Sequence, residues 1–433
     1  MLSSPNSGGS SNDSTTTTIE KEAYYHGLLP REDVRLLLDK NGDYLVRSSE
    51  ATKGEVSRSY IVSVMFDNKL DEEHSVKHYV VNHADRKYWV SQEASFDSIQ
   101  FLIAHYSKTP SADVIKMVSP VKRVFWELEH ESITILKKLG EGAFGEVSAG
   151  SLKFKKGGKQ VSVAVKQAKL EKMGKEQIKD FMAEARNMRK FGHQNVVRFY
   201  GVAVLQEPLY LVMELATGGA LDHYLKKNED LSVEKRNEML LQAAWGLEYL
   251  HGKPVLHRDI AARNCLYGDG KVKISDFGLT RTGTFYQMRA GGKVPIRWLA
   301  LETIKTFIYT QKTDVWSYGI MAWEIYNNGG EPYPGLTLPE VTTQIQSGYR
   351  MTLPPHATPD VQTLVTKCWA ENANDRPTMP DIATALQRIT GIHRPNFAAI
   401  ARKEAEELLL MNTATHKGTQ RRRAKKAAVP KGM

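Results

Sequence analysis

The stretch His257-Arg258-Asp259-Ile-Ala-Ala-Arg263-Asn264, followed by Asp276-Phe277-Gly278, decides how this chain folds and what it can do. Asp276 stands seventeen residues after Asp259. An Asp carboxylate is a candidate proton acceptor, and an Asn amide and a second carboxylate offer the oxygen ligands that a hard divalent cation prefers. The stretch therefore predicts a base beside a metal site, and its meaning depends on what precedes it.

A glycine-rich segment lies upstream of that stretch. Residues 139–147 read Leu-Gly-Glu-Gly-Ala-Phe-Gly-Glu-Val. A dinucleotide-binding turn has the same glycine spacing, but it leads directly into a helix. Here a strand-like run and a Lys/Gly turn follow, and then the strand-like Val161-Ser-Val-Ala-Val-Lys166. The order strand, glycine loop, strand predicts a lid whose backbone N–H groups cover phosphates.

A lysine and a glutamate follow the lid. Strand alternation places Ala164 and Lys166 on the face opposite the three valines, under the predicted lid. For Lys166 taken alone, an exposed strand lysine is the simpler interpretation. Glu184, however, lies at the edge of the apolar arc of an amphipathic helix, where an unpaired carboxylate is costly. We therefore expect Lys166 and Glu184 to pair.

A phosphate lid, a Lys–Glu pair, a base and two metal ligands are the parts of a phosphoryl-transfer site. Over roughly residues 133–390 the chain thereby resembles the eukaryotic protein kinases, with a β-rich N-lobe and a helical C-lobe. The resemblance implies ATP and Mg²⁺ (or Mn²⁺) as cofactors, with Asn264 and Asp276 as metal ligands. The implied catalytic residues are Asp259, Lys166, Glu184, Arg263 and Asn264. The implied ATP site consists of Leu139, Gly140, Glu141, Gly142, Ala143, Phe144, Gly145, Glu146, Val147, Ala164, Lys166, Met213 and Glu214.

The sequence also indicates whether the phosphate goes to a serine/threonine or a tyrosine hydroxyl. Serine/threonine kinases carry a lysine two positions after the catalytic Asp, where this chain has Ala261. Arg263, two residues further on, resembles the arrangement of tyrosine kinases. Residues 293–298, Lys-Val-Pro-Ile-Arg-Trp, resemble the shelf on which those enzymes rest the phenol ring, with Pro295 facing it. Both signals predict tyrosine specificity.

One tyrosine is a candidate switch. Tyr286 lies ten residues after Asp276, in a segment rich in glycine and threonine. A phosphate on Tyr286 adds about −1.5 to −2 charge, for which Arg258 is a fixed cation nearby. We expect autophosphorylation there to order the loop, and the alternative is an ordinary exposed tyrosine.

A second, smaller unit precedes the first. Tyr25-His-Gly27, Tyr44-Leu-Val-Arg-Ser-Ser49 and Lys77-His-Tyr79 resemble the Src-homology-2 (SH2) domain over about residues 25–117. The resemblance implies a central antiparallel sheet flanked by two helices. The residue pattern opens an amphipathic helix at Pro30-Arg-Glu-Asp33 and fits a second helix to Phe96–Tyr106. An Arg at the end of a hydrophobic strand offers a bidentate fork to a phosphate, although a solvated strand Arg is the simpler alternative. The implied phosphotyrosine-binding residues are Arg31, Arg47, Ser49 and His78.

Composition bounds the remaining classes of protein. The chain has 433 residues, of which 41% are hydrophobic and 25% charged, and only two are cysteines. These values exclude a disordered, collagen-like or disulfide-framed chain, and no apolar run approaches the roughly 18 residues of a membrane span. The formal net charge is +10, and residues 413–433 carry seven basic and no acidic residues. The body is thus nearly neutral, and nucleic-acid binding is not expected.

The sequence therefore predicts an α+β protein of five segments: 1–23 disordered, 24–118 SH2, 119–132 linker, 133–390 tyrosine kinase, and 391–433 a C-terminal helix with a basic tail. An SH2 domain directly before a tyrosine kinase most resembles the Fes/Fer branch of cytoplasmic kinases. The expected partners are tyrosine-phosphorylated proteins and protein tyrosine substrates. Two alternatives stay open: an inactive adaptor, and weak contact of the tail with the anionic inner face of the plasma membrane.

Overall fold

The computed structural model describes residues 18–48, 59–71, 73–109, 111, 113–142, 145–154, 159–168, 175–289 and 294–413. The chain divides into two compact units, Met1–Glu127 with Val204–Gln206, and Leu128–Ala203 with Glu207–Met433. Each unit has its own five-stranded sheet and its own hydrophobic core. The basic tail from residue 414 onward and residues 1–17 lie outside the described residues.

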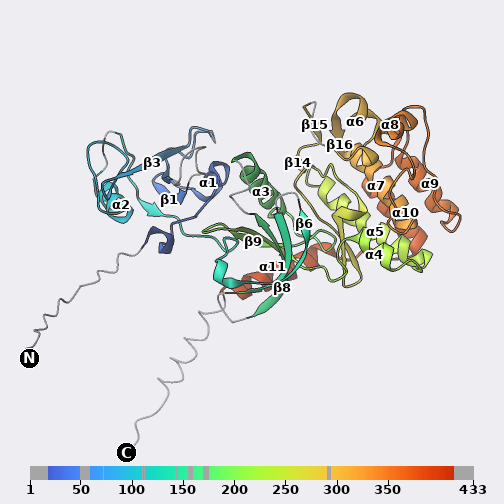
Figure 1. The fold of residues 1–433 in the computed structure, drawn as a ribbon, viewed down its shortest axis with the longest axis horizontal. Helices are drawn as coiled ribbons and strands as arrows, with labels where there is room; N and C mark the ends of the chain where they lie inside the picture. Colours follow the sequence, from blue (N-terminus) through green and yellow to red (C-terminus); the bar gives the residue numbers. More distant parts are fainter. Residues whose placement is uncertain are drawn as a thin grey trace, which may run out of the picture. The chain divides into compact units, whose positions relative to one another are not determined.

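In its described residues, the first unit consists of one sheet and two α-helices (Figure 1). Helix α1 precedes the sheet in sequence, and helix α2 contributes to the hydrophobic core on one face of the sheet. Its strands run in the order β4-β3-β2-β1-β5, and the first four pair antiparallel, as predicted. The short strand β5 joins the edge in parallel with β1. The bounds are α1 Arg31–Leu37, β1 Asp43–Ser48, β2 Tyr60–Met65, β3 Val76–Ala84, β4 Lys87–Trp89, α2 Ile99–Lys108 and β5 Ser119–Pro120.

Strand alternation decides which face of β1 carries function. Tyr44 and Val46 belong to the core that β2 and α2 complete. Because successive side chains of a strand point to opposite faces, Leu45 and Arg47 lie on the other face, away from α2. The hydrophobic pattern thus directs the arginine to one face and the core to the other.

Two sequence predictions for this unit are wrong in detail. Order begins before Tyr24, because Ile19 lies in a short 3-10 turn and is buried in the core. Helix α2 begins at Ile99 rather than Phe96, because Ser98 caps it by accepting a hydrogen bond from the Phe101 N–H. Phe96 instead forms an isolated bridge with Tyr88. Apolar spacing alone does not mark a helix start, whereas a capping hydroxyl does.

The second unit begins with an antiparallel sheet in the order β6-β7-β8-β10-β9. Val163 and Val165 of β8 point into a core that also contains residues of β7 and β10. Helix α3, which carries Glu184, lies between β8 and β9 in sequence. The bounds are β6 Ile133–Gly142, β7 Gly145–Lys153, β8 Gln160–Ala168, α3 Lys175–Met188, β9 Phe199–Ala203 and β10 Leu209–Glu214.

Apart from the C-terminal helix at residues 397–413, the rest of the second unit is largely helical and lies to one side of this sheet (Figure 1). Helix α7 is buried continuously from Thr313 to Tyr326 and forms the centre of this lobe. None of the helices among the described residues combines the length and the apolarity needed to cross a membrane. The helices are α4 Leu221–Lys227, α5 Val233–His251, α6 Leu301–Thr306, α7 Gln311–Tyr326, α8 Leu338–Gln346, α9 Pro359–Cys368, α10 Met379–Thr390 and α11 Phe397–Thr413. The short strands are β11 Val255–Leu256, β12 Cys265–Gly268, β13 Lys271–Ile274, β14 Arg281–Thr282, β15 Phe285–Gln287 and β16 Ile308–Thr310.

Candidate functional site

The glycine-rich segment is the turn of a hairpin. Strands β6 and β7 stay paired through Gly140, Glu141 and Gly142, which face Val147, Glu146 and Gly145. At Gly145 the φ is +145°, and an added Cβ would lie 2.3 Å from the Gln167 carbonyl oxygen, so only glycine fits. Ala143 and Phe144, the predicted tip, lie outside the described residues. Because a strand follows the glycines, the dinucleotide-binding alternative is excluded.

The predicted nucleotide residues lie on neighbouring strands beneath this hairpin. Val147 pairs with Lys166 across β7 and β8, and Ala164 pairs with Met213 across β8 and β10. Ala164 and Lys166 are buried opposite the core valines, as alternation predicts. Leu139, at the end of β6, is 52% exposed and contributes an apolar surface open to solvent.

Lys166 and Glu184 form the predicted ion pair. The Lys166 Nζ donates to Glu184 Oε2 at 2.7 Å, and both side chains are buried. Burial raises the pKa of the Glu184 carboxyl, Lys166 opposes that shift, and Asp276 adds to it. A lysine held so by a buried carboxylate presents its charge at one fixed depth under the lid.

The catalytic stretch is a loop held from below by α7. Both Asp314 carboxylate oxygens accept backbone bonds, from the His257 N–H at 2.9 Å and the Arg258 N–H at 2.8 Å. Asp259 accepts from Arg263 Nη2 at 2.5 Å, and the Asn264 amide donates to the Asp259 carbonyl at 2.9 Å. Burial raises the pKa of the Asp259 carboxyl, and Arg263 opposes the shift.

Asp276 and Phe277 are neighbours in sequence but differ in exposure to solvent. Phe277 is fully buried against the rings of Phe191 and His257, while Asp276 is exposed with φ +59°. The Asp276 charge raises the pKa of both Glu184 and Asp259, so the three carboxylates share one neighbourhood. Among the described residues no three His, Cys, Asp or Glu side chains cluster as a metal site. The candidate metal ligands are therefore Asp276 and the Asn264 amide, whose oxygen atoms are of the kind that a hard divalent cation prefers.

A contact chain that the sequence analysis did not anticipate joins the catalytic loop to the predicted substrate shelf. The Arg263 guanidinium lies 4.0 Å over the Trp298 ring. Glu324 Oε2 accepts from Trp298 Nε1 and from the Ala262 N–H, both at 3.0 Å. The sequence signal for this contact chain was Glu324, a glutamate inside the apolar run of α7. A buried carboxylate needs hydrogen-bond partners, so its presence there predicts polar contacts. Lys293, the first residue of the shelf, lies outside the described residues.

The candidate switch residue contacts its predicted cation. Tyr286, on β15, pairs in register with Tyr309 of β16. The Arg258 guanidinium lies 4.3 Å from the centres of both rings, and Arg281 lies 5.5 Å from the Tyr286 ring. Two cations therefore face the side chain to which a phosphate would be added.

Two of the predicted phosphate-binding residues of the first unit, Arg47 of β1 and His78 of β3, lie on the sheet face opposite α2, and Arg31 begins α1. Arg47 Nε donates to Ser63 Oγ at 3.4 Å, and Ser63 bonds His78 Nδ1 at 2.8 Å. Burial, then Arg47 and Arg31, lower the pKa of His78 to about 4, so this ring stays neutral beside the two cations. Ser49 lies outside the described residues. Sequence reasoning missed Ser63, a fully buried hydroxyl in an otherwise apolar strand.

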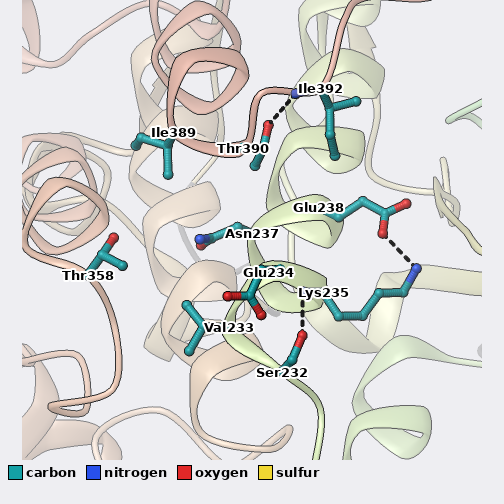
Figure 2. Close-up of a pocket in the computed structure, with 10 residues that line it drawn as sticks. All are labelled: Ser232, Val233, Glu234, Lys235, Asn237, Glu238, Thr358, Ile389, Thr390 and Ile392. Carbon is teal, nitrogen blue, oxygen red and sulfur yellow. Dashed lines mark hydrogen bonds and ion pairs between the residues drawn. The ribbon is translucent and has the colours of Figure 1, made fainter.

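A cavity of about 420 Å³ lies elsewhere, at the N-terminal end of α5 (Figure 2). Within its lining, Lys235 Nζ donates to Glu238 Oε2 at 2.8 Å and the Lys235 N–H donates to the Ser232 hydroxyl at 3.2 Å. The catalytic loop follows the opposite end of α5, and 19 helical residues span about 28 Å. This cavity is therefore separate from the catalytic residues.

Comparisons with known proteins agree with this geometry. The family model for protein tyrosine and serine/threonine kinases matches residues 133–386, and the SH2 domain model matches residues 24–106. Fer-related kinase 1 of Caenorhabditis elegans is 40% identical over 378 residues, covering 85% of this chain and 94% of that relative. Tyrosine-protein kinase Fer of Homo sapiens is 36% identical over 85% of this chain, which spans 44% of Fer. Tyrosine-protein kinase ABL2 of Homo sapiens is 35% identical over 90% of this chain, which spans 33% of ABL2.

The fold and the matched domains define a protein kinase preceded by an SH2 domain. The chain belongs to the SH2-containing non-receptor tyrosine kinase family, alongside Fer-related kinases.

Proposed function

We propose that this chain transfers the γ-phosphate of ATP to tyrosine hydroxyls of proteins. The observation that carries the proposal is that Arg263 bonds Asp259 while its guanidinium stacks on the Trp298 ring. It supplies the cation near the reacting phosphate from the loop position that tyrosine kinases use, while Ala261 leaves the serine/threonine position without charge. The Trp298 ring beside it continues the surface that would receive a phenol.

Lys166 and Glu184 serve the nucleotide in this proposal. Lys166 holds the α- and β-phosphates, and Glu184 fixes its position through the buried pair. The flat base lies against Ala164 and Val147 under the glycine hairpin, and Met213 limits how deeply it enters. Positioning and charge complementarity of this kind supply most of the catalysis in phosphoryl transfer.

Asp259 serves the acceptor. Its carboxylate accepts the hydrogen bond of the substrate hydroxyl and takes the proton as the phosphate is transferred, and Arg263 keeps it in place. Asn264 and Asp276 would hold Mg²⁺, which would neutralise charge on the phosphates. The Asp314 bonds to the loop keep the base at a fixed height above α7.

The first unit directs the enzyme to partners. Arg47 and Arg31 bind the phosphate of a phosphotyrosine, with Ser63 and His78 lining the pocket. In this proposal the chain works in the cytoplasm, where its partners are proteins already phosphorylated on tyrosine.

The test is transfer of labelled phosphate from ATP to a poly-Glu/Tyr polymer and to a serine/threonine polymer by the full chain. We expect incorporation into the tyrosine polymer alone, dependent on Mg²⁺ and lost in Asp259→Asn. No incorporation by the folded wild-type chain would support the inactive-adaptor alternative and contradict the proposal. Transfer to both polymers would contradict the assigned specificity.

A further inference from the structure

The C-terminal helix α11 follows the kinase fold and lies back against it. Its partly buried residues fall on one stripe, whose members are Phe397, Ile400, Ala401, Glu404 and Leu408. This spacing of three and four residues is one face of a helix, and the positions between are exposed. The helix lies beside β8 and β9 in Figure 1, in agreement with the packing of Leu408. The stripe is therefore a contact face.

The first half of this face is anchored to the helical lobe. Arg394, just before α11, pairs with Glu248 of α5. The Phe397 ring packs against Trp245 of α5 at 5.4 Å and against His193 at 4.2 Å between ring centres. The beginning of α11 is thus held to α5 by one charge pair and two ring contacts.

The second half of this face is anchored to the sheet lobe. Glu404 forms an ion pair with Arg198, the residue before β9. Burial lowers the pKa of Arg198, but Glu404, Tyr200 and Glu214 together outweigh burial and leave that pKa raised. One turn further on, Leu408 packs against the core that contains Val163 and Val165 of β8. One helix therefore contacts both lobes.

The residue that Glu404 holds also contacts the predicted nucleotide site. The backbone N–H of Arg198 donates to Glu214 Oε2 at 3.2 Å. Glu214 ends β10, directly after Met213, and its other oxygen pairs with Lys273 of the helical lobe at 3.0 Å. Glu404, Arg198, Glu214 and Lys273 thus form a continuous chain of alternating charges across the connection between the lobes.

We propose that α11 is an intramolecular strap that fixes the two kinase lobes relative to each other, with Glu404 as a positioning residue that acts through Arg198 on Glu214. The inference rests on the proposed function, because it concerns the same nucleotide site. Helix α11 touches neither ATP nor substrate. It sets the separation of the lobes, and so the closeness of the lid and of Met213 to the base.

The test measures steady-state kinetics and binding of a fluorescent ATP analogue by the full-length Glu404→Gln variant. Glu407→Gln is the matched control, an exposed glutamate on the same helix. We expect KM for ATP and the analogue's Kd to rise about two- to fivefold, the range for a partly exposed ion pair. The kcat and the KM for peptide stay within twofold of wild type, a split that general destabilisation would not give. Glu404→Asp, which keeps the negative charge, should recover part of the loss.

A second pair of variants tests the apolar anchor. Leu408→Asp should raise KM for ATP more than Leu410→Asp, because Leu410 is 64% exposed. Equal effects of Glu404→Gln and Glu407→Gln, or a fall in kcat with unchanged KM for ATP, would overturn the strap. An inactive wild type that still binds the analogue would overturn the proposed function alone, since the binding measurements test the strap independently.

Discussion

Glu324 is a residue whose substitution should change the stability of the kinase unit by an amount that depends on pH. Its side chain is buried in α7, and burial raises the pKa of its carboxyl from 4.5 to about 7. One oxygen accepts from the Ala262 N–H and from Trp298 Nε1. Glu324→Gln keeps an acceptor oxygen for both donors and removes the cost of ionising a buried acid. We therefore expect this substitution to stabilise the kinase unit, and to do so more strongly at high pH.

The magnitude follows from the shift in pKa. A raised pKa means that the carboxyl contributes stability fully below pH 4.5 and loses it as pH rises through about 7. At about 1.36 kcal/mol per pKa unit, the full loss is roughly 3 kcal/mol, of which about 1.4 kcal/mol is already lost at pH 5.5. Glu324→Gln should thus gain about 2 kcal/mol more at pH 8.5 than at pH 5.5. For a kinase domain spanning residues 133–386, with about 2.1 cal/mol/K of unfolding entropy per residue, this equals roughly 4 °C in Tm.

The assay is thermal unfolding of wild type and variant at both pH values. Glu331→Gln is the control, because Glu331 is a glutamate of the same lobe that is ion-paired with Arg297 but has a side chain 68% exposed. Its effect should stay under about 1 kcal/mol at either pH. If Glu324→Gln changes Tm equally at pH 5.5 and 8.5, the carboxyl does not titrate near 7 and the reasoning fails.

Four further predictions concern the catalytic, phosphate-binding and switch residues. Lys166→Arg and Asp259→Asn should each reduce tyrosine phosphorylation below a tenth of wild type without lowering Tm. For Lys166→Arg the reason is that the wider, planar guanidinium cannot occupy the position of the Lys166 ammonium. A variant that keeps more turnover would refute the role of that residue. Arg47→Ala should weaken phosphopeptide binding by a few hundred-fold in calorimetry, from the roughly 3–5 kcal/mol lost when a buried ion pair is broken, and less than about tenfold would rule Arg47 out as the pocket base. The same change should raise the pKa of His78 from about 4 in an NMR titration, because the Arg47 charge depresses it, and an unchanged value would place Arg47 away from His78. Tyr286→Phe should abolish the rate increase that preincubation with ATP and Mg²⁺ gives wild type, because the phosphate that would pair with Arg258 cannot form; equal rates, with no phosphate on Tyr286 by mass spectrometry, would exclude the switch.

Local patterns predicted the parts of the site that depend on short-range geometry. Alternation along β8 placed Val163 and Val165 in the core and Lys166 opposite them, because a strand has a period of two residues wherever it lies. The Lys166–Glu184 pair followed from the cost of leaving a carboxylate unpaired at the edge of an apolar face. Phe96 shows the limit of this reasoning, since its apolar spacing fits a helix although it lies before the Ser98 cap.

The sequence by itself determined the order of the two domains and predicted the catalytic set and the tyrosine specificity, because each rests on residue types at fixed short spacings. Only the tertiary structure decided which distant residues meet. Glu324 contacts Trp298 across 26 positions, and Glu404 returns to Arg198 across more than two hundred. Such contacts form where packed elements bring two surfaces together, and no local period encodes that meeting. The way α11 lies against both kinase lobes is therefore a property of the folded chain alone.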